Sequence, residues 1–221
     1  MTEGGGIRLY GITQNPETKN YLVVMKYMKL GSLRSNLMVK KYNPGDKHIN
    51  LYYISNSLSI LHNQCKLVHG DLHSGNLFLT SHDYVCIGDF GLSKPVDKPS
   101  KSKEIYGILP YIAPEVLRGN PYTKAADIYS FGIIMWEMTS GIPAFNNVTH
   151  DFDLSLKICE GLRPKIIEGT EIEYAELMEK CWNSDTNKRP KAEDLVAYFK
   201  DIFFYSNERV PVPGNKIIYL C

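Results

Sequence analysis

The chain has 221 residues, a formal net charge of +1 at pH 7 and five cysteines. That length is enough for one sizeable domain with a buried core, while the near-neutral charge provides no basic field for nucleic acid. The apolar runs are too short to span a bilayer. The cysteines are scattered, odd in number and without metal-ligand spacing. We therefore expect reduced thiols, a cytoplasmic location, and neither nucleic acid nor membrane as a partner.

The first predicted element is a β hairpin. Residues 7–12 and 21–25 are rich in β-branched or aromatic side chains, and Asn15 lies between them in a segment with turn chemistry. A short helix capped by Ser32 is predicted directly after the hairpin. This combination of strand and helix describes structure only and does not by itself indicate a ligand.

An amphipathic helix is predicted before the segment 69–76. Its apolar positions recur at intervals of three and four residues: Leu51, Ile54, Leu58 and Leu61. After the segment, short apolar runs at 77–79 and 84–87 predict a second hairpin. The residues just before and just after this hairpin should therefore lie at one edge of a small β unit.

Three polar residues flank the second hairpin. Asp71 and Asn76 precede it, and Asp89 follows it, so we expect the two carboxylates to reach a single cleft. Carboxylate and amide oxygens suit Mg²⁺, and phosphoryl transfer requires mainly positioning and charge neutralisation. The pattern indicates that Asp71 orients a substrate hydroxyl and accepts its proton, while Asn76 and Asp89 bind magnesium. The alternative for Asp71 is a solvated turn residue.

The remainder of the chain is predicted to be helical. Apolar positions at helical spacing mark the segments 128–138, 174–182 and 192–203. Asp127, at the start of the first of these helices, would cost several kcal/mol if it were buried without a partner, so we expect donors around it. Residues 206–221 are expected to fray.

These features belong to an ordered set of motifs that resembles a protein kinase catalytic domain. The set comprises His69-Gly70-Asp71-Leu72-His73-Ser74-Gly75-Asn76, Asp89-Phe90-Gly91, Ala113-Pro114-Glu115, Asp127-Ile128-Tyr129-Ser130-Phe131-Gly132, Cys181-Trp182 and Lys188-Arg189-Pro190. Several ordered motifs over most of the chain are far stronger evidence than a lone Asp-Phe-Gly triplet. The mixture of features is most similar to the tyrosine-kinase-like group.

The resemblance implies an α+β, protein-kinase-like fold that consists mostly of the helical large lobe. Residues 1–28 would be a remnant of the small lobe and the hinge, residues 29–205 the large lobe, and residues 206–221 a disordered tail. The family's Gly-rich phosphate loop, its ion-pairing Lys and the Glu partner of that Lys lie upstream of the first predicted strand. We therefore expect a kinase domain that lacks most of its small lobe.

The resemblance also implies the site residues and the cofactors, which are ATP and Mg²⁺. The catalytic residues would be Asp71, Asn76 and His73, and the metal ligands would be Asn76 and Asp89. The residues in contact with the nucleotide would be Met25, Lys26, Met28 and Phe78. Met25 takes the gatekeeper position in this alignment, and the backbone from residue 26 to residue 28 would pair with the edge of the adenine.

Other motif residues have structural roles in the family. Asp127 matches the residue that holds the backbone of the catalytic loop. Glu115 and Arg189 match a buried ion pair that anchors the end of the activation segment, residues 89–115. His69 and Phe90 match stacking positions that connect the two lobes.

Several residues depart from the family pattern. Gly70 replaces the usual Arg that pairs with an activation-segment phosphate, and His73 stands where Ser/Thr kinases usually carry a Lys. Ile108 and Tyr111 leave the choice between Ser/Thr and Tyr substrates open. The hydroxyls that could be phosphorylated belong to Ser93, Ser100, Ser102 and Tyr106. Without the Arg, control by a phosphate on any of these residues is not expected.

Three hypotheses follow. The first is a protein kinase that transfers the ATP γ-phosphate to protein Ser/Thr hydroxyls, or to Tyr. The second is a binding or scaffolding module of the pseudokinase type, because efficient transfer requires the absent Lys–Glu pair. The third is a truncated fragment of a longer kinase, which would expose an uncovered strand edge and be poorly soluble. The oligomeric state is left open.

Overall fold

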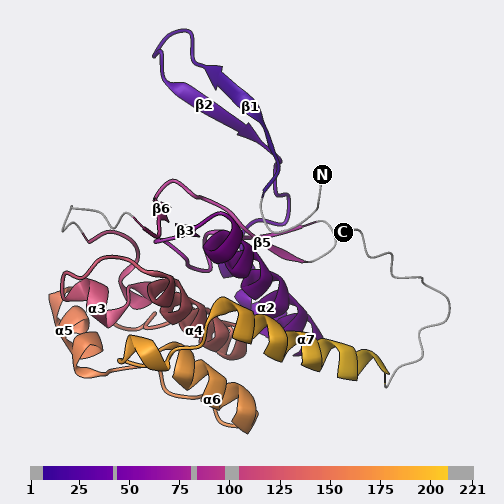
Figure 1. Ribbon diagram of the computed structural model, residues 1–221, viewed down its shortest axis with the longest axis vertical. Helices are drawn as coiled ribbons and strands as arrows, with labels where there is room; N and C mark the ends of the chain where they lie inside the picture. Colours follow the sequence, from indigo (N-terminus) through magenta and orange to yellow (C-terminus); the bar gives the residue numbers. More distant parts are fainter. Residues whose placement is uncertain (1–6, 42–43, 81–83, 98–104, 209–221) are drawn as a thin grey trace.

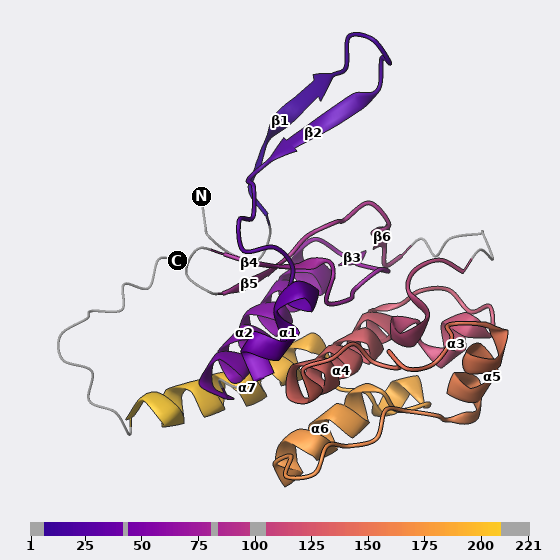
Figure 2. The ribbon, with the colours of Figure 1, turned by 180° about the vertical axis from the view of Figure 1, so that it is seen from behind.

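The computed structural model describes residues 7–41, 44–80, 84–97 and 105–208. Side chains are described for all of these residues except 39–41, 44–45 and 203–208. Figure 1 shows a body made mostly of helices and a two-stranded hairpin that stands away from it, and Figure 2 shows the same separation from behind.

The hairpin predicted near the start of the chain is present. β1 (Leu9–Gln14) pairs antiparallel with β2 (Tyr21–Met25), although the first strand begins and ends later than predicted. The turn forms because the side-chain oxygen of Asn15 accepts hydrogen bonds from the N–H groups of Glu17, at 2.8 Å, and Thr18, at 3.1 Å.

Two helices precede the catalytic-loop segment in the chain. α1 (Leu33–Lys41) follows Ser32, and α2 (Pro44–Ser59) continues into the π-helical turn η1 (Ile60–Gln64). The four residues predicted to form the apolar face are all buried: Leu51, Ile54, Leu58 and Leu61. α2 packs along α7 (Ala192–Glu208), and the two helices lie side by side in Figure 1. This packing fixes the point at which the loop begins.

Two short antiparallel strand pairs frame the candidate site. β3 (Leu67–Val68) pairs with β6 (Lys94–Pro95), and β4 (Leu77–Leu79) pairs with β5 (Val85–Ile87). The second predicted hairpin is therefore confirmed, while its turn at residues 81–83 lies outside the described residues. The segment with Asp71 runs from β3 to β4, and the segment with Asp89 runs from β5 to β6.

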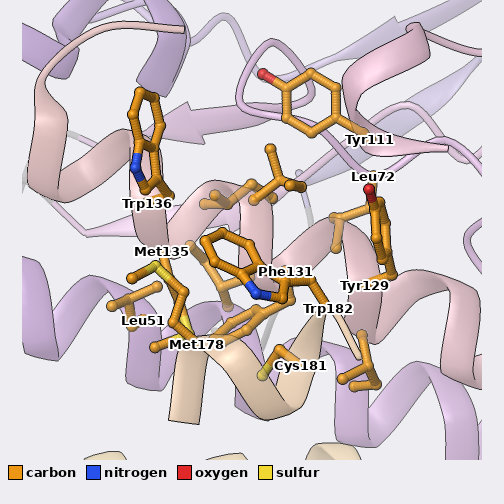
Figure 3. Close-up of a cluster of buried hydrophobic side chains, with 14 of the residues drawn as sticks. Leu51, Leu72, Tyr111, Tyr129, Phe131, Met135, Trp136, Met178, Cys181 and Trp182 are labelled. Carbon is orange, nitrogen blue, oxygen red and sulfur yellow. The ribbon is translucent and has the colours of Figure 1, made fainter. Parts of the chain in front are cut away.

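The rest of the body surrounds one central helix. The central helix is α4 (Lys124–Ser140). The elements around it are η2 (Leu109–Tyr111), α3 (Pro114–Leu117), α5 (Phe152–Glu160), α6 (Ile172–Cys181) and η3 (Thr186–Lys188). α4 and α6 approach closely, since a Cβ at Gly132 would lie only 2.8 Å from the Cβ of Cys181. Figure 3 shows the resulting core, in which Phe131 and Met178 lie in one cluster with Leu72 of the catalytic loop.

The observed architecture confirms the α+β, protein-kinase-like fold class, with a helical body and a hairpin in place of a larger β lobe. α7 continues through Glu208, and residues 209–221 lie outside the described part of the chain. The division into residues 1–28, 29–205 and 206–221 stays a prediction. Among the helices of the described ranges, none combines the length and apolar character needed to cross a membrane.

Candidate active site

A buried carboxylate fixes the backbone of the catalytic loop. Asp127, in the first turn of α4, is 1 % exposed. Its oxygens accept hydrogen bonds from the N–H groups of His69, at 2.8 Å, and Gly70, at 3.0 Å, and from Nε2 of His62, at 2.8 Å. The predicted need of this acid for donors is confirmed. Because ionic hydrogen bonds are strong, the loop is tied firmly to the central helix.

His69 connects the catalytic loop to the segment that carries Asp89. Its Nδ1 accepts a hydrogen bond from the Asp71 N–H at 3.3 Å, so the neutral ring carries its hydrogen on Nε2. Nε2 in turn donates to the Gly88 carbonyl at 3.1 Å. The ring of His69 is fully buried and its centroid lies 5.4 Å from that of Phe90, which is 43 % exposed. His69 is thus a core residue that stacks near Phe90.

Asp71 and Asn76 are in direct contact. The Asn76 Nδ2 donates to the Asp71 carbonyl at 2.9 Å and lies 3.3 Å from the Asp71 Oδ2. Since the Nδ2 of Asn76 faces Asp71, the Oδ1 of Asn76 is the atom left to face a cation. None of the described hydrogen bonds uses this Oδ1. The pair therefore presents one carboxylate and one amide oxygen from adjacent positions.

His73 acts electrostatically on Asp71. Its Nδ1 accepts a hydrogen bond from the Gly75 N–H at 3.0 Å, so Nε2 carries the hydrogen and lies 3.7 Å from the Asp71 Oδ2. This imidazole holds the pKa of the Asp71 carboxyl below its ordinary value, with help from His69 and Asn76 and against the effect of burial. Asp71 is therefore ionised at neutral pH, the state that can accept a proton.

Asp89 is brought next to the catalytic loop through the backbone. The Gly88 N–H donates to the Asn76 carbonyl at 2.9 Å. Asp89 itself has φ +58°, and its exposed side chain accepts a hydrogen bond from the Gly91 N–H at 3.3 Å. Within the described ranges, no three His, Cys, Asp or Glu side chains are grouped for a metal. A cation here would need Asn76 and Asp89 together with oxygens from water or a bound nucleotide.

Three of the four predicted nucleotide-binding residues lie at the end of β2 or just after it. Met25 is 49 % exposed. The Lys26 N–H donates to the Arg8 carbonyl at 2.8 Å, and the Met28 carbonyl accepts a hydrogen bond from the Gly31 N–H at 3.0 Å. Among the described hydrogen bonds, none uses the Lys26 carbonyl or the Met28 N–H. These two groups are thus available to a planar ligand with a donor and an acceptor on one edge.

Phe78, the fourth predicted residue, meets a residue that the sequence patterns did not single out. A Cβ added at Gly88 would lie 2.6 Å from Cδ1 of Ile7 and 3.0 Å from Cε2 of Phe78. Ile7 and Phe78 therefore approach each other over the Gly88 backbone, directly before Asp89. No periodicity or motif in the sequence indicates this contact.

The end of the activation segment is anchored by the predicted ion pair. Arg189 Nη1 and Nη2 donate to the two oxygens of Glu115, each at 2.7 Å. The same guanidinium also binds the carbonyls of Ala125 and Asn183, both at 2.8 Å. This bidentate arrangement satisfies a fully buried cation, so the ion pair is confirmed as a structural one.

A second buried network was missed by the sequence patterns. The Tyr111 hydroxyl donates to Oε1 of Glu137 at 2.5 Å, accepts from Nη2 of Arg34 at 2.7 Å and lies 3.0 Å from Oγ of Ser74. Burial raises the pKa values of both Tyr111 and Glu137. The network connects α1, the catalytic loop, the activation segment and α4. Its only signal in the sequence was a Glu inside an otherwise apolar helix.

A pocket opens beside Asp71. Its wall includes Tyr106, Gly107 and Ile108 of the activation segment, together with Tyr122. Its volume is about 10 Å³, so it has room for about one water molecule beside the carboxylate. Of the hydroxyls considered for phosphorylation, those of residues 100 and 102 lie outside the described residues.

Fold and motifs together define a protein-kinase-type domain, and comparison with known proteins identifies the family. Residues 6–199 match the family described as protein tyrosine and serine/threonine kinase. The chain belongs to this family. It is 36 % identical over 196 residues to the probable serine/threonine-protein kinase roco8 of Dictyostelium discoideum. It is 31 % identical over 201 residues to the serine/threonine/tyrosine-protein kinase HT1 of Arabidopsis thaliana, which agrees with the expected tyrosine-kinase-like grouping.

The chain spans only part of the curated relatives that it matches. The alignment covers 82 % of this chain and 10 % of roco8, and 88 % of this chain and 50 % of HT1. A putative serine/threonine-protein kinase/receptor of Acanthamoeba polyphaga mimivirus is 32 % identical over 184 residues, which are 83 % of this chain and 11 % of that protein. The similarity therefore concerns the kinase domain and not the other parts of these proteins.

Proposed function

We propose that the chain transfers the terminal phosphoryl group of ATP to protein Ser or Thr hydroxyls, with Tyr hydroxyls as the alternative acceptor. The observation that carries the proposal is the contact between Asp71 and Asn76, which places a carboxylate beside an amide whose Oδ1 is used by none of the described hydrogen bonds. The names of the relatives, which include serine/threonine-protein kinases and one serine/threonine/tyrosine-protein kinase, support the acceptor class.

Asp71 is the group that orients the acceptor hydroxyl and accepts its proton. Its lowered pKa keeps it ionised, and its side chain is 18 % exposed, so a substrate hydroxyl can reach it. His73 directs its Nε2–H toward the same carboxylate, 3.7 Å away, so it helps to hold Asp71 in one orientation. This neutral donor supplies less charge stabilisation than the Lys found in other family members.

Asn76 and Asp89 fit a magnesium ion by chemistry, because both present hard oxygen ligands. Bound Mg²⁺ would neutralise the charge of the ATP phosphates. Asn76 Oδ1 has no competing hydrogen bond in the described structure, and the Gly88–Asn76 backbone bond keeps Asp89 near it. The adenine would be bound by the Lys26 carbonyl and the Met28 N–H, beside Met25 and Phe78.

A radiolabel transfer assay tests this proposal. The full chain is incubated with γ-labelled ATP, Mg²⁺ and a generic protein substrate, in parallel with Asp71→Asn. Transfer is expected to fall by about 10²–10⁴-fold in the variant, because a positioned general base contributes that much. Asp201→Asn, which changes an exposed Asp on α7, is the matched control and should transfer as the parent does. A parent that transfers no phosphate to any substrate would refute the proposal.

A second function, a binding module of the pseudokinase type, is favoured by one observation. The surface that would receive the nucleotide is open: Met25 is 49 % exposed, Tyr27 81 % and Phe90 43 %. Thermal shift in a titration with ATP, with and without Mg²⁺, distinguishes the two functions when it is combined with the transfer assay. Saturable stabilisation without transfer supports the binding module, whereas transfer that depends on Asp71 excludes it.

A protein substrate, the absence of nucleic acid and membrane partners, and a cytoplasmic location complete the proposal. They rest on the near-neutral charge and on the scattered cysteines. Cys65, Cys86, Cys159 and Cys181 are free thiols in the structure.

A further inference from the structure

The space beside Gly70 is filled by a side chain of the activation segment. Gly70 has φ +78°, and its N–H is bound by the buried Asp127. A Cβ added at Gly70 would lie 3.3 Å from the Leu92 carbonyl oxygen and 3.6 Å from the hydroxyl oxygen of Tyr106. A longer side chain at position 70 would therefore need the space that Tyr106 occupies.

Tyr106 is held in this space by its ring. The ring stacks on that of Tyr122, with a centroid separation of 4.5 Å and an interplanar angle of 13°. The Lys94 Nζ lies 4.5 Å from the centroid of the Tyr106 ring, which is a cation–π geometry. Lys94 and Tyr106 come from the two halves of the activation segment, and Tyr122 comes from the loop before α4. Their contact therefore joins segments that are far apart in the sequence.

The backbone of Tyr106 is held by the same neighbour. The Tyr122 hydroxyl accepts a hydrogen bond from the Tyr106 N–H at 3.3 Å and donates one to the Tyr106 carbonyl. Burial raises the pKa of Tyr122 to about 12, so the hydroxyl keeps its proton near neutral pH and can continue to donate. One hydroxyl thus satisfies both backbone groups of Tyr106.

The hydroxyl of Tyr106 itself contributes nothing to this arrangement. It is buried and has no hydrogen-bond partner, whereas a buried polar group normally has one. The ring and the backbone therefore make the contacts. A phenylalanine at this position should make the same contacts and avoid burying an unpaired polar atom.

The position of Tyr106 determines what lies against Asp71. The next residue, Gly107, has φ +107°, and a Cβ added there would lie 3.0 Å from Oδ1 of Asp71. The backbone of the activation segment thus passes directly beside the Asp71 carboxylate at Gly107, which has no side chain to keep the two apart. A shift of Tyr106 would carry Gly107 with it and change both the pocket and the surroundings of the carboxylate.

We propose that Tyr106 is a positioning residue for the reaction at Asp71. Its ring, docked beside Gly70 and held by Tyr122 and Lys94, keeps the activation segment against the carboxylate through contacts that involve no phosphate group. The inference rests on the proposed function only where it concerns turnover. The docking of the segment is a structural statement and is tested without activity.

Amide hydrogen exchange of the full chain, measured by mass spectrometry, tests the docking. In Tyr106→Ala, peptides covering residues 105–113 are expected to exchange about tenfold faster than in the parent, because the segment opens locally. Tyr106→Phe should match the parent within about twofold, since the hydroxyl has no partner. Peptides from α6 serve as the internal control, and Tyr21→Ala, which changes a tyrosine that is 77 % exposed, is the matched variant.

Tyr122→Phe keeps the stacked ring and removes the hydroxyl that binds the Tyr106 backbone, so it serves as a second variant if Tyr106→Ala does not fold. It should also speed exchange in the 105–113 peptides by about tenfold. Unchanged exchange in both the Tyr106→Ala and Tyr122→Phe variants would overturn the inference. So would a Tyr106→Phe variant that exchanges as fast as Tyr106→Ala, because the hydroxyl would then carry the contact.

Kinetics separate positioning from general stability. In Tyr106→Ala we expect the KM for the protein substrate to rise by about fivefold or more, while the KM for ATP stays within about twofold of the parent value. In Tyr106→Phe we expect both KM values to match those of the parent. Equal changes in both KM values, following the loss of melting temperature, would indicate a merely structural residue and contradict the inference. If the parent transfers no phosphate, the proposed function fails, while the exchange experiment still decides whether Tyr106 docks the segment.

Discussion

The β1–β2 hairpin and helix α4 are both rich in apolar side chains but have opposite environments. Ile12 of β1 is 68 % exposed, whereas Ile134 of α4 is fully buried. In the hairpin all five residues of β2 are exposed, so apolar side chains on both faces of the strand meet solvent. In α4 even the acidic residues Asp127 and Glu137 are buried and bound by donors.

This difference shows what apolar composition alone does and does not determine. The hairpin has its turn and its strand pairing, which are local, but two strands without a covered face are at best marginally stable in water. The helical body buries α4 between α6 and the catalytic loop, and this packing positions the polar site. The body therefore provides the geometry of the candidate active site, and residues 26–28, which we predict to bind adenine, follow the hairpin.

The largest effect is expected from removing the carboxylate that ties the body to the loop. Asp127→Ala would leave three donors unpaired in the interior, from His62, His69 and Gly70. We expect a loss of about 3–5 kcal/mol in the free energy of unfolding, measured by urea denaturation. Asp201→Ala, at an exposed position, should change it by less than about 0.5 kcal/mol. Equal effects would show that the loop does not depend on Asp127.

A matched pair of isoleucines tests the contrast between the two regions directly. Ile134→Ala should cost about 2–5 kcal/mol of unfolding free energy, because it opens a cavity in a packed core. Ile12→Ala should cost less than about 0.5 kcal/mol, because the side chain is already mostly in water. A large loss for Ile12→Ala would mean that the hairpin packs against a surface in solution.

The exposed hairpin should also cause association, as the sequence led us to expect. Open strand edges and apolar faces favour pairing between chains. Ile12 and Val23 face each other across the two strands, so Ile12→Lys combined with Val23→Glu places opposite charges side by side and preserves the hairpin. We expect the double variant to need about tenfold more protein to associate, measured by sedimentation velocity. A parent chain that stays monomeric at all concentrations would contradict this expectation.

The smallest effect concerns pH. The pKa of Asp71 is lowered in the folded chain by His73, so this carboxylate stabilises the fold above the ordinary Asp pKa, and the contribution is lost as pH falls through the lowered value. In His73→Gln the loss should begin at a higher pH, which moves the acid-unfolding midpoint upward when it is followed by circular dichroism. In an Asp71→Asn background the same change should have no effect on the midpoint. An unmoved midpoint in the first variant would refute the coupling.

The parts of the structure that followed from the sequence are those with local or periodic signals. Leu51 and Leu58 showed the face of α2, and Asn15 marked the hairpin turn. The position of Asp127 at the start of an apolar helix indicated a charge that needed donors, and the structure supplies three. The fold class and the Glu115–Arg189 pair followed from the family resemblance.

The contacts that could not be predicted join side chains without a shared pattern. Tyr106 and Tyr122 are sixteen residues apart, with η2 and α3 between them in the chain, so no helix or strand period relates them. The π-helical turn at Ile60–Gln64 keeps Leu61 buried, so the apolar spacing did not distinguish it from the end of an α-helix. The approach of Ile7 to Phe78 depends on how the hairpin meets the body, which neither segment encodes alone.

The most direct test of the account is a paramagnetic probe of the candidate site. Mn²⁺ with ATP is added to the isotope-labelled full chain, and the loss of amide signals is mapped by nuclear magnetic resonance. We predict loss around Asp71, Asn76 and residues 88–91, with the signals of α6 and of the β1–β2 turn retained. Signals that vanish elsewhere, or persist at those positions when ATP and Mn²⁺ are saturating, would contradict the claim that the helical body assembles a metal-dependent phosphotransfer site.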